Sequence, residues 1–171
     1  MRSGTRFVFI LSAVAAAAIS CQATARRVRV EDSIAIVSGE QASAAEDLAA
    51  KEVRRYIYLR TGALLPIVKG DWKKLPKSDL IVVASKRQPV VKVVTQKSPK
   101  ISACAGALES EQYMLKTLRH KKRQVVLVTG GDDTGTLYGA YRFAEHLGVR
   151  FYLHGDTIPD GRIPLKLPDL D

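Results

Sequence analysis

Short apolar runs bounded by glycine, proline or charged residues recur along the chain and predict between four and six strands. These runs lie at residues 34–37, 64–68, 79–84, 111–118, 124–129 and 149–153. The run at 79–84 is apolar at nearly every position, which is typical of a strand buried on both faces. Pro66 limits its own run to an edge or bulged strand, because proline cannot donate a backbone hydrogen bond. The charged segment 119–123 joins two β-rich runs, so an antiparallel hairpin is expected there.

Two longer segments carry apolar residues at steps of three and four, the spacing of one face of an α-helix. The first segment begins at Ser43 and Glu46, which have the spacing of a capping box. Gly62 follows the segment and supplies a left-handed position at which the helix ends. The expected apolar stripe of this helix consists of Ala45, Leu48, Ala49, Val53, Tyr56 and Ile57.

The second helix is expected between the glycine-rich loop 129–135 and Gly148. Asp133 or Thr134 should cap its first turn, because the side chains of both can accept a hydrogen bond from the backbone. If its apolar stripe packs in the core, Tyr141→Ala should destabilise the domain by about 3 kcal/mol. That stripe consists of Leu137, Ala140, Tyr141, Phe143, Ala144 and Leu147.

Two helices and several short strands predict an α/β domain with an α+β two-layer architecture, in which both helices cover one face of the sheet. The hairpin makes this sheet mixed rather than purely parallel. Residues 86–110 are the hardest to assign, because the valines at 90–94 fit a helical turn as well as a strand. The length of 171 residues suits one domain, which we place at residues 26–160 and expect to be followed by a tail at 161–171.

The first 25 residues have the three parts of a secretory signal peptide. Two arginines precede an apolar run at 7–19, and residues 23–25 give the small-x-small pattern of a cleavage site. The run is too short to cross a hydrocarbon core of about 30 Å. We therefore expect export to the periplasm or to the outside of the cell. An alternative is lipoprotein anchoring through Cys21, which ends a segment that loosely resembles a lipobox.

The composition limits which partners the chain can have. Lys and Arg number 27 against 17 Asp and Glu, so the formal net charge is +10. A solvated face is the simplest role for these basic residues, and the functional alternative is attraction to acidic polysaccharide or to anionic lipid headgroups. Aromatic residues make up only 6 % of the chain, which disfavours a surface that stacks on bases. Nucleic acid is not expected as a partner, because the protein is expected to be exported.

The loop 129–135 is the first candidate for chemistry, because a glycine-rich loop between a strand and a helix often cradles phosphate. It matches neither of the common phosphate-binding glycine patterns, and Asp132 and Asp133 would repel an anion. A glycosidase needs two carboxyl groups about 5–10 Å apart, normally from separate segments, whereas these two are adjacent. We therefore expect the loop to form a turn and a helix cap, and we assign no catalytic residue.

Metal-ligating residue types are sparse. The three histidines are His120, His146 and His154, and none has metal-ligand spacing to another histidine or to an acid. His120 is expected in the charged hairpin turn, and His146 at a helix C-terminus, where a cation is mildly favoured. Removal of the leader would leave Cys104 as the single cysteine, so no internal disulfide could form. No metal-binding or cofactor-binding residue is assigned, and no cofactor is expected.

Three segments carry motifs of a known family. The first, 44–68, contains AAEDLA, TGA and LPIV, and the second is IVV at 81–83. The third segment, 125–152, contains VVLVTGG, TGTLYGAYRFAEH and LGVRFY. Together they resemble the N-terminal domain of α-glucuronidases, to which the second domain of β-N-acetylhexosaminidases is similar in fold. The resemblance spans roughly residues 34–160.

The resemblance implies an accessory role. In that family the domain precedes a TIM barrel that carries the catalytic acid and base, and this chain ends where such a barrel would begin. We therefore expect a non-catalytic N-terminal domain, or a truncated copy, of an exported glycoside hydrolase that degrades polysaccharide, with the catalytic barrel as its partner. Gln112, Tyr113 and the lysine-rich insertions depart from the family pattern. The alternative is a stand-alone envelope binding protein that uses its basic surface for acidic glycans.

Overall fold

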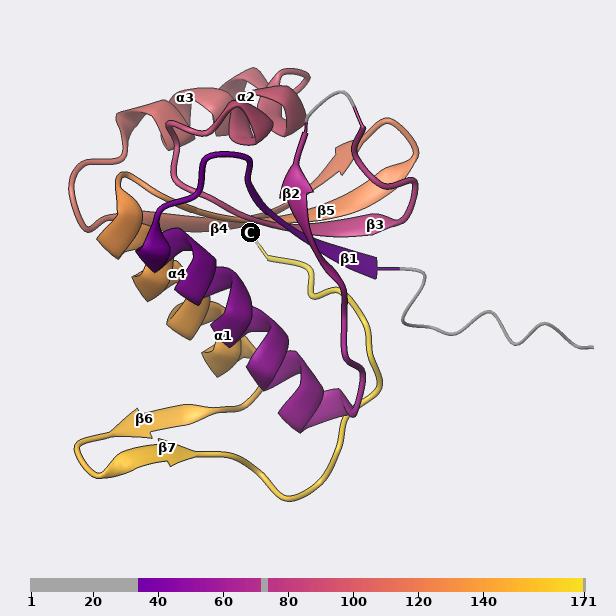
Figure 1. The fold of residues 1–171 in the computed structure, drawn as a ribbon, viewed down its shortest axis with the longest axis vertical. Coiled ribbons are helices and arrows are strands. Elements are labelled where there is room, and N and C mark those ends of the chain that lie inside the picture. Colours follow the sequence, from indigo (N-terminus) through magenta and orange to yellow (C-terminus); the bar gives the residue numbers. More distant parts are fainter. Residues whose placement is uncertain (1–33, 72–73, 171) are drawn as a thin grey trace, which may run out of the picture.

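The computed structural model describes residues 34–71 and 74–170 (Figure 1), so the expected signal peptide and Cys21 lie outside the described residues. Five strands form one sheet in the order β2-β1-β3-β5-β4. The first four strands in this order are parallel and β4 is antiparallel to β5, which confirms the predicted mixed sheet and hairpin. The strand bounds are Ile34–Gly39 (β1), Ile67–Gly70 (β2), Asp79–Val83 (β3), Tyr113–His120 (β4) and Arg123–Gly130 (β5).

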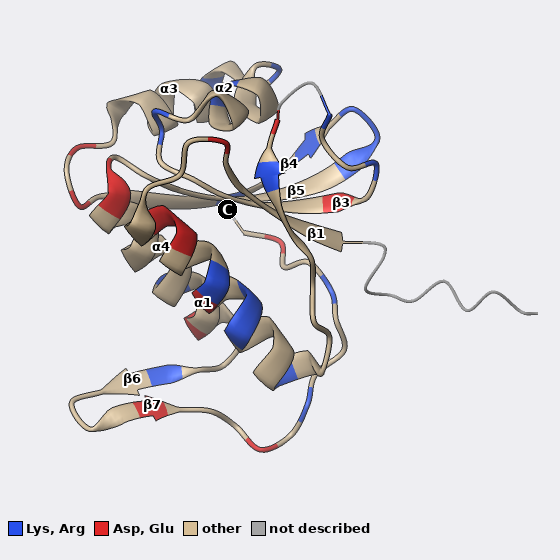
Figure 2. Ribbon diagram, viewed as in Figure 1, with Lys and Arg blue, Asp and Glu red and all other residues tan. Residues whose placement is uncertain are grey.

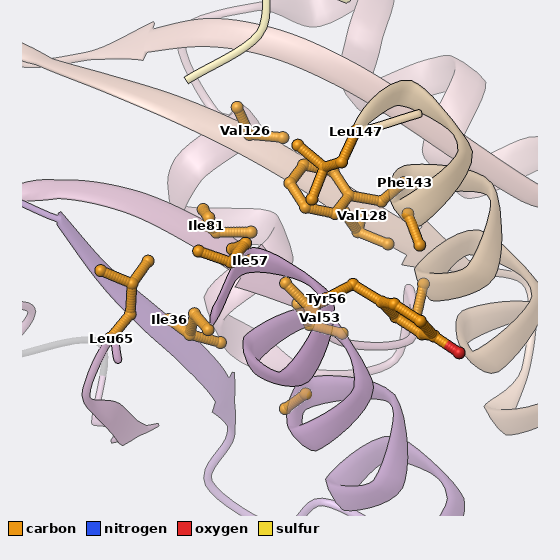
Figure 3. Packing of buried hydrophobic residues seen from close by; sticks show 14 of the residues in the cluster. Ile36, Val53, Tyr56, Ile57, Leu65, Ile81, Val126, Val128, Phe143 and Leu147 are labelled. Carbon is orange, nitrogen blue, oxygen red and sulfur yellow. The ribbon is translucent and has the colours of Figure 1, made fainter. Parts of the chain in front are cut away.

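Two long helices, α1 (Ala44–Thr61) and α4 (Asp133–His146), cover one face of the sheet as predicted (Figure 1). Leu48 does not belong to the inner face of α1, since 42 % of its surface is exposed. The sheet and the two helices enclose a core, part of which Figure 3 shows. Core residues that are at most 2 % exposed include Ile36, Val53, Tyr56, Ile57, Leu65, Ile81, Val126, Val128 and Phe143.

The opposite face of the sheet is covered by two shorter helices, α2 (Pro89–Thr95) and α3 (Pro99–Ala107) (Figure 1). The segment that the sequence left unassigned is therefore helical, and the domain has three layers where two were predicted. Val90, Val91 and Val94 are at most 2 % exposed. They form a second core with the side chains on the sheet face that α2 and α3 cover. The physical reason is the apolar character of the central strands on both faces, which requires cover on both sides.

The last predicted strand does not join the main sheet. Instead β6 (Arg150–Tyr152) pairs antiparallel with β7 (Gly155–Thr157) as a separate two-stranded sheet. Phe151 packs edge-to-face on Tyr56 and Tyr141, with ring centroids 5.6 and 5.2 Å away. The Tyr56 hydroxyl donates to Oδ2 of Asp156 at 2.9 Å. Because an isolated two-stranded ribbon is only marginally stable, these contacts with α1 and α4 stabilise the hairpin.

Both long helices begin with a side-chain cap. The Ser43 hydroxyl accepts from the Glu46 N–H at 3.2 Å, and the Glu46 carboxylate accepts from the Ser43 N–H at 2.9 Å, which confirms the capping box. The cap of α4 is Asp132 rather than Asp133 or Thr134, because the helix begins one residue earlier than expected. The carboxylate of Asp132 accepts from a backbone N–H of the first turn at 2.7 Å.

Glycines end both long helices, as their positions predict. Gly62 and Gly148 have φ angles of 80° and 91°, a left-handed conformation that glycine adopts without a steric penalty. After α4, the N–H groups of Gly148 and Val149 donate back to the carbonyls of Glu145 and Ala144, the pattern of a Schellman motif. None of the helices described here is both long enough and apolar enough to cross a membrane.

The tail, expected at 161–171, returns across the domain and packs against it. The Thr117 N–H donates to the Leu170 carbonyl at 2.9 Å, and the Leu170 N–H donates to the Thr117 hydroxyl at 3.0 Å. Leu167 and Leu170 are each 6 % exposed and extend the core beneath β4. The guanidinium of Arg60, itself 5 % exposed, donates to the carbonyls of Leu147, Pro159 and Gly161.

Candidate functional site

The carboxyl ends of parallel strands are where open α/β sheets commonly hold ligands. β1, β3 and β5 end at the same edge of this sheet, and the chain continues from it into α1, α2 and α4. What this edge can do depends on the bonds that its polar groups already make. We call it the carboxyl edge and define it by the polar residues that follow the three strands, namely Glu46, Ser85, Lys86, Gln88, Asp132 and Asp133.

Glu46 is buried at the carboxyl edge, with 1 % of its surface exposed. Besides the Ser43 N–H, its carboxylate accepts from the Ser85 N–H at 2.7 Å and from the Gln88 side-chain amide at 2.9 Å. A Cβ at Gly39 would lie 2.4 Å from the Gln88 side chain, so the strand end and Gln88 are in close contact. Glu46 thus connects the start of α1 to the ends of β1 and β3, and its acceptors face protein donors rather than a substrate.

The two adjacent carboxylates at the start of α4 make separate contacts. Oδ2 of Asp132 accepts from the Ser110 hydroxyl at 2.5 Å, and its carboxylate also accepts from backbone N–H groups of Gly135 and Glu111. These hydrogen bonds, that from Ser110 first, hold the pKa of Asp132 below its usual range. Asp133 instead lies 3.4 Å from the guanidinium of Arg87. A carboxylate with a lowered pKa has no proton to give near neutral pH, so Asp132 is suited to capping and not to general acid catalysis.

The loop that resembled a phosphate cradle is filled by neighbouring backbone. A Cβ at Gly131 would stand 1.8 Å from the carbonyl oxygen of Glu109. The Lys86 ammonium donates to the carbonyls of Gly106 at 3.1 Å and Leu108 at 2.5 Å, which ties the end of α3 to the carboxyl edge. The glycines therefore allow close packing of two chain segments, and the nearby lysine is already bonded within the protein.

The three histidines lie on different elements. His120 was expected in the charged turn, but as the last residue of β4 it is 2 % exposed, and its Nδ1 has no hydrogen-bond partner. His146 ends α4, and the His154 ring stacks on Tyr152 beside the β6–β7 turn, with centroids 6.2 Å apart. Within residues 34–71 and 74–170, no group of three His, Cys, Asp or Glu side chains could hold a metal ion. Cys104 is exposed on α3.

Two buried charged residues were missed by the sequence interpretation, although their spacing contained the signal. Glu46 and Arg60 stand three residues before Ala49 and three after Ile57, so both fall on the inner face of α1. The sequence pattern predicts Glu46 in the capping box and on the polar face of the helix, which is wrong for the face because Glu46 is buried, and it gives Arg60 no role. A charged residue that shares the three- and four-residue spacing of an apolar helix face is a candidate for a buried hydrogen-bond network.

The geometry defines a three-layer α/β domain whose carboxyl-edge polar groups bond largely to one another and to nearby backbone. A family model for the N-terminus of glycosyl hydrolase family 67 matches residues 17–143. The chain belongs to this family, in agreement with its resemblance to α-glucuronidase N-terminal domains. The match covers the sheet and most of α4, while the LGVRFY motif lies beyond it. Comparison with curated proteins found no match.

Proposed function

We propose that the chain is a non-catalytic N-terminal domain, or a truncated copy, of an exported glycoside hydrolase that degrades polysaccharide. Its partner in this proposal is a catalytic TIM barrel. The observation that carries the proposal is the match of the chain to a family of N-terminal domains. The internal hydrogen bonds of Glu46 and Asp132 add support, since they leave these carboxylates poorly placed for acid–base work.

A hydrolysis assay tests the absence of catalysis. The expressed chain, with Asp132→Ala as a variant, is given 4-nitrophenyl glycosides of several sugars, and we expect no turnover by either protein. The same assay on a version extended by the downstream reading frame should show turnover if that frame encodes the barrel. Hydrolysis by the chain alone that Asp132→Ala abolishes would overturn the proposal.

Export is a separate part of the proposal and rests on the leader pattern at residues 1–25. Cleavage after residue 25 removes two arginines and lowers the net charge from +10 to +8. Sequencing the N-terminus of the protein recovered from its host distinguishes the outcomes. A mature chain that starts at residue 26 supports secretion, a lipidated start at Cys21 supports the lipoprotein alternative, and an intact Met1 excludes both.

A second candidate function is a stand-alone envelope protein that binds acidic glycans through its basic surface. The observation that favours it is the uneven distribution of charge, with lysines and arginines concentrated around the β4–β5 hairpin (Figure 2). A stop codon directly after Asp171 together with independent expression supports this candidate. A continuous frame that encodes a barrel supports the first.

A further inference from the structure

Acidic and basic residues are distributed unevenly between the two ends of the sheet (Figure 2). Acidic residues cluster at the carboxyl edge, around the starts of α1 and α4. At the other end lie the β4–β5 turn, Lys97 two residues after the end of α2, and the returning tail. We define the hairpin-end patch by the cations at that end: Lys97, Arg119, Lys121, Lys122, Arg123 and Lys166.

The cations of the hairpin-end patch are not neutralised by carboxylates. None of the six forms a salt bridge among the residues that the structure describes. Arg123 donates to the carbonyl of Pro76, and the nearby carboxylate of Asp79 accepts from the Gln124 N–H at 2.8 Å. Several carboxylates elsewhere on the surface are paired with cations, as Asp133 is with Arg87. Positive charge at this end is therefore concentrated and open to an external anion.

Buried His120 provides an internal measure of this positive charge. Its burial first, and then the nearby charges of Arg123, Lys121 and Lys97, lower its pKa, while a hydrogen bond to the backbone of Val94 acts in the opposite direction. These three cations, from the hairpin and from the residues after α2, are the charged groups that act on it. His120 is too buried to touch a ligand, so any effect of a bound anion on it acts through the local potential.

A groove adjoins the patch where the tail lies along β4. It has a volume of about 550 Å³, within the range of ordinary ligand sites. Arg119 and Gln124 line it from the hairpin, and Lys166 lines it from the tail, together with the carboxylate of Asp169. Two cations and an amide on opposite walls suit a ligand that combines carboxylates with hydroxyl groups.

The described side chains at this end disfavour two other kinds of polyanionic partner, single-stranded nucleic acid and a membrane surface. The large hydrophobic residues that the structure leaves exposed lie elsewhere, on α1, before β2, at the start of β4, on α4 and on β6–β7. Among the residues that the structure describes, the patch thus offers no ring on which a base could stack and no apolar side chain to insert into a membrane. The family to which the chain belongs is one of glycoside hydrolases.

We propose that the hairpin-end patch and its groove bind a carboxylated polysaccharide. This inference deepens the second candidate function and rests on it for the class of ligand. Attraction of this kind weakens as salt rises, because the contacts are exposed and largely electrostatic.

Binding of polygalacturonate to the expressed chain, measured by calorimetry at two salt concentrations, tests the proposal. The triple variant R119Q/K122Q/K166Q removes three patch cations, and K51Q/K92Q/R162Q removes three exposed cations elsewhere as a control matched in net charge. We expect the patch variant to lose about tenfold in affinity, equivalent to about 1.4 kcal/mol, and the control variant to lose less than about twofold. Neutral dextran should not bind.

A second readout follows the protonation of His120 by NMR. Bound polygalacturonate should raise the pKa of His120 in the wild-type chain and in the control variant, and should do so much less in the patch variant. Equal losses in both triple variants, an unchanged His120 titration, or equal or tighter binding of duplex DNA or anionic vesicles would overturn the proposal. None of these results bears on whether the chain is the partner of a catalytic barrel, because that is tested by hydrolysis.

Discussion

Glu46 offers the sharpest test of what holds the carboxyl edge together. Its carboxylate accepts from three donors, the N–H groups of Ser43 and Ser85 and the amide of Gln88, at 2.7–2.9 Å. Glu46→Gln keeps the size of the side chain but replaces one acceptor oxygen with an NH₂ group. In the least costly arrangement that group faces the Ser85 N–H, because the other oxygen then still serves Ser43 and Gln88.

The expected cost follows from that arrangement. One hydrogen bond to a charged group, worth about 1.5–3 kcal/mol, is lost, and two donors are left facing each other in a buried position. We therefore expect Glu46→Gln to lower the free energy of unfolding by about 2–3 kcal/mol. The helix propensities of Glu and Gln are nearly equal, so α1 itself contributes little to this change.

Urea denaturation at pH 7, followed by circular dichroism, measures the change. Asp47→Asn is the matched control, because Asp47 is the residue next to Glu46 but is much more exposed. Its carboxylate lies 2.5 Å from the Lys69 ammonium, and both side chains are substantially exposed. An exposed pair contributes at most about 1 kcal/mol, so the control should remain close to the wild type. If Glu46→Gln cost no more than Asp47→Asn, the role of Glu46 as a buried connection would be refuted.

Three further predictions concern other parts of the fold. Phe143→Ala should lower the free energy of unfolding by about 3–5 kcal/mol in urea denaturation. Tyr141→Ala should lower it by less than the value of about 3 kcal/mol expected from sequence, since Tyr141 is only half-buried. The reverse order would contradict the packing of α4. Arg60→Met should speed amide hydrogen exchange in residues 159–170 while the central strands stay protected, because three carbonyls lose their donor. Unchanged exchange in the tail would count against a role of Arg60 in holding the tail. Burial lowers the pKa of His120 in the folded chain, so the unfolded chain takes up this proton first. Stability should therefore be complete above pH 6.5 and fall as the pH drops below it, and His120→Gln should reduce that slope in denaturation measured from pH 7 to 5.

The sequence predicted correctly those features that depend on nearby residues, and it missed features that depend on contacts between distant segments. The capping box of Ser43 and Glu46, the glycine ends of both long helices and the β4–β5 hairpin depend on residues within a few positions of one another. The same interpretation missed α2 and α3 as a third layer, because valines at 90–94 satisfy either secondary structure until the sheet face they cover is known. It also placed residues 149–153 in the main sheet, since a short apolar run does not specify its pairing partner.

The candidate site shows the same division. Sequence alone predicted a turn and a helix cap at the start of α4, although it assigned the cap to Asp133 or Thr134 and the structure has Asp132 there. It placed His120 in an exposed turn, whereas the alternation of β4 and the cover of α2 bury its ring. The strand register decides which side chain of a hairpin faces inward, and a shift of one residue reverses that choice.

By itself the sequence determined the two long helices, the mixed sheet and the family, because periodicity, caps and motifs depend on residues that are close together in the sequence. Only the tertiary structure decided which charges are buried and which stand together. Glu46 and Ser85 are 39 residues apart, and Arg119 and Lys166, which are 47 residues apart, line one groove. Burial and electrostatic potential are sums over all segments that converge in space, so they exist only once the chain has folded.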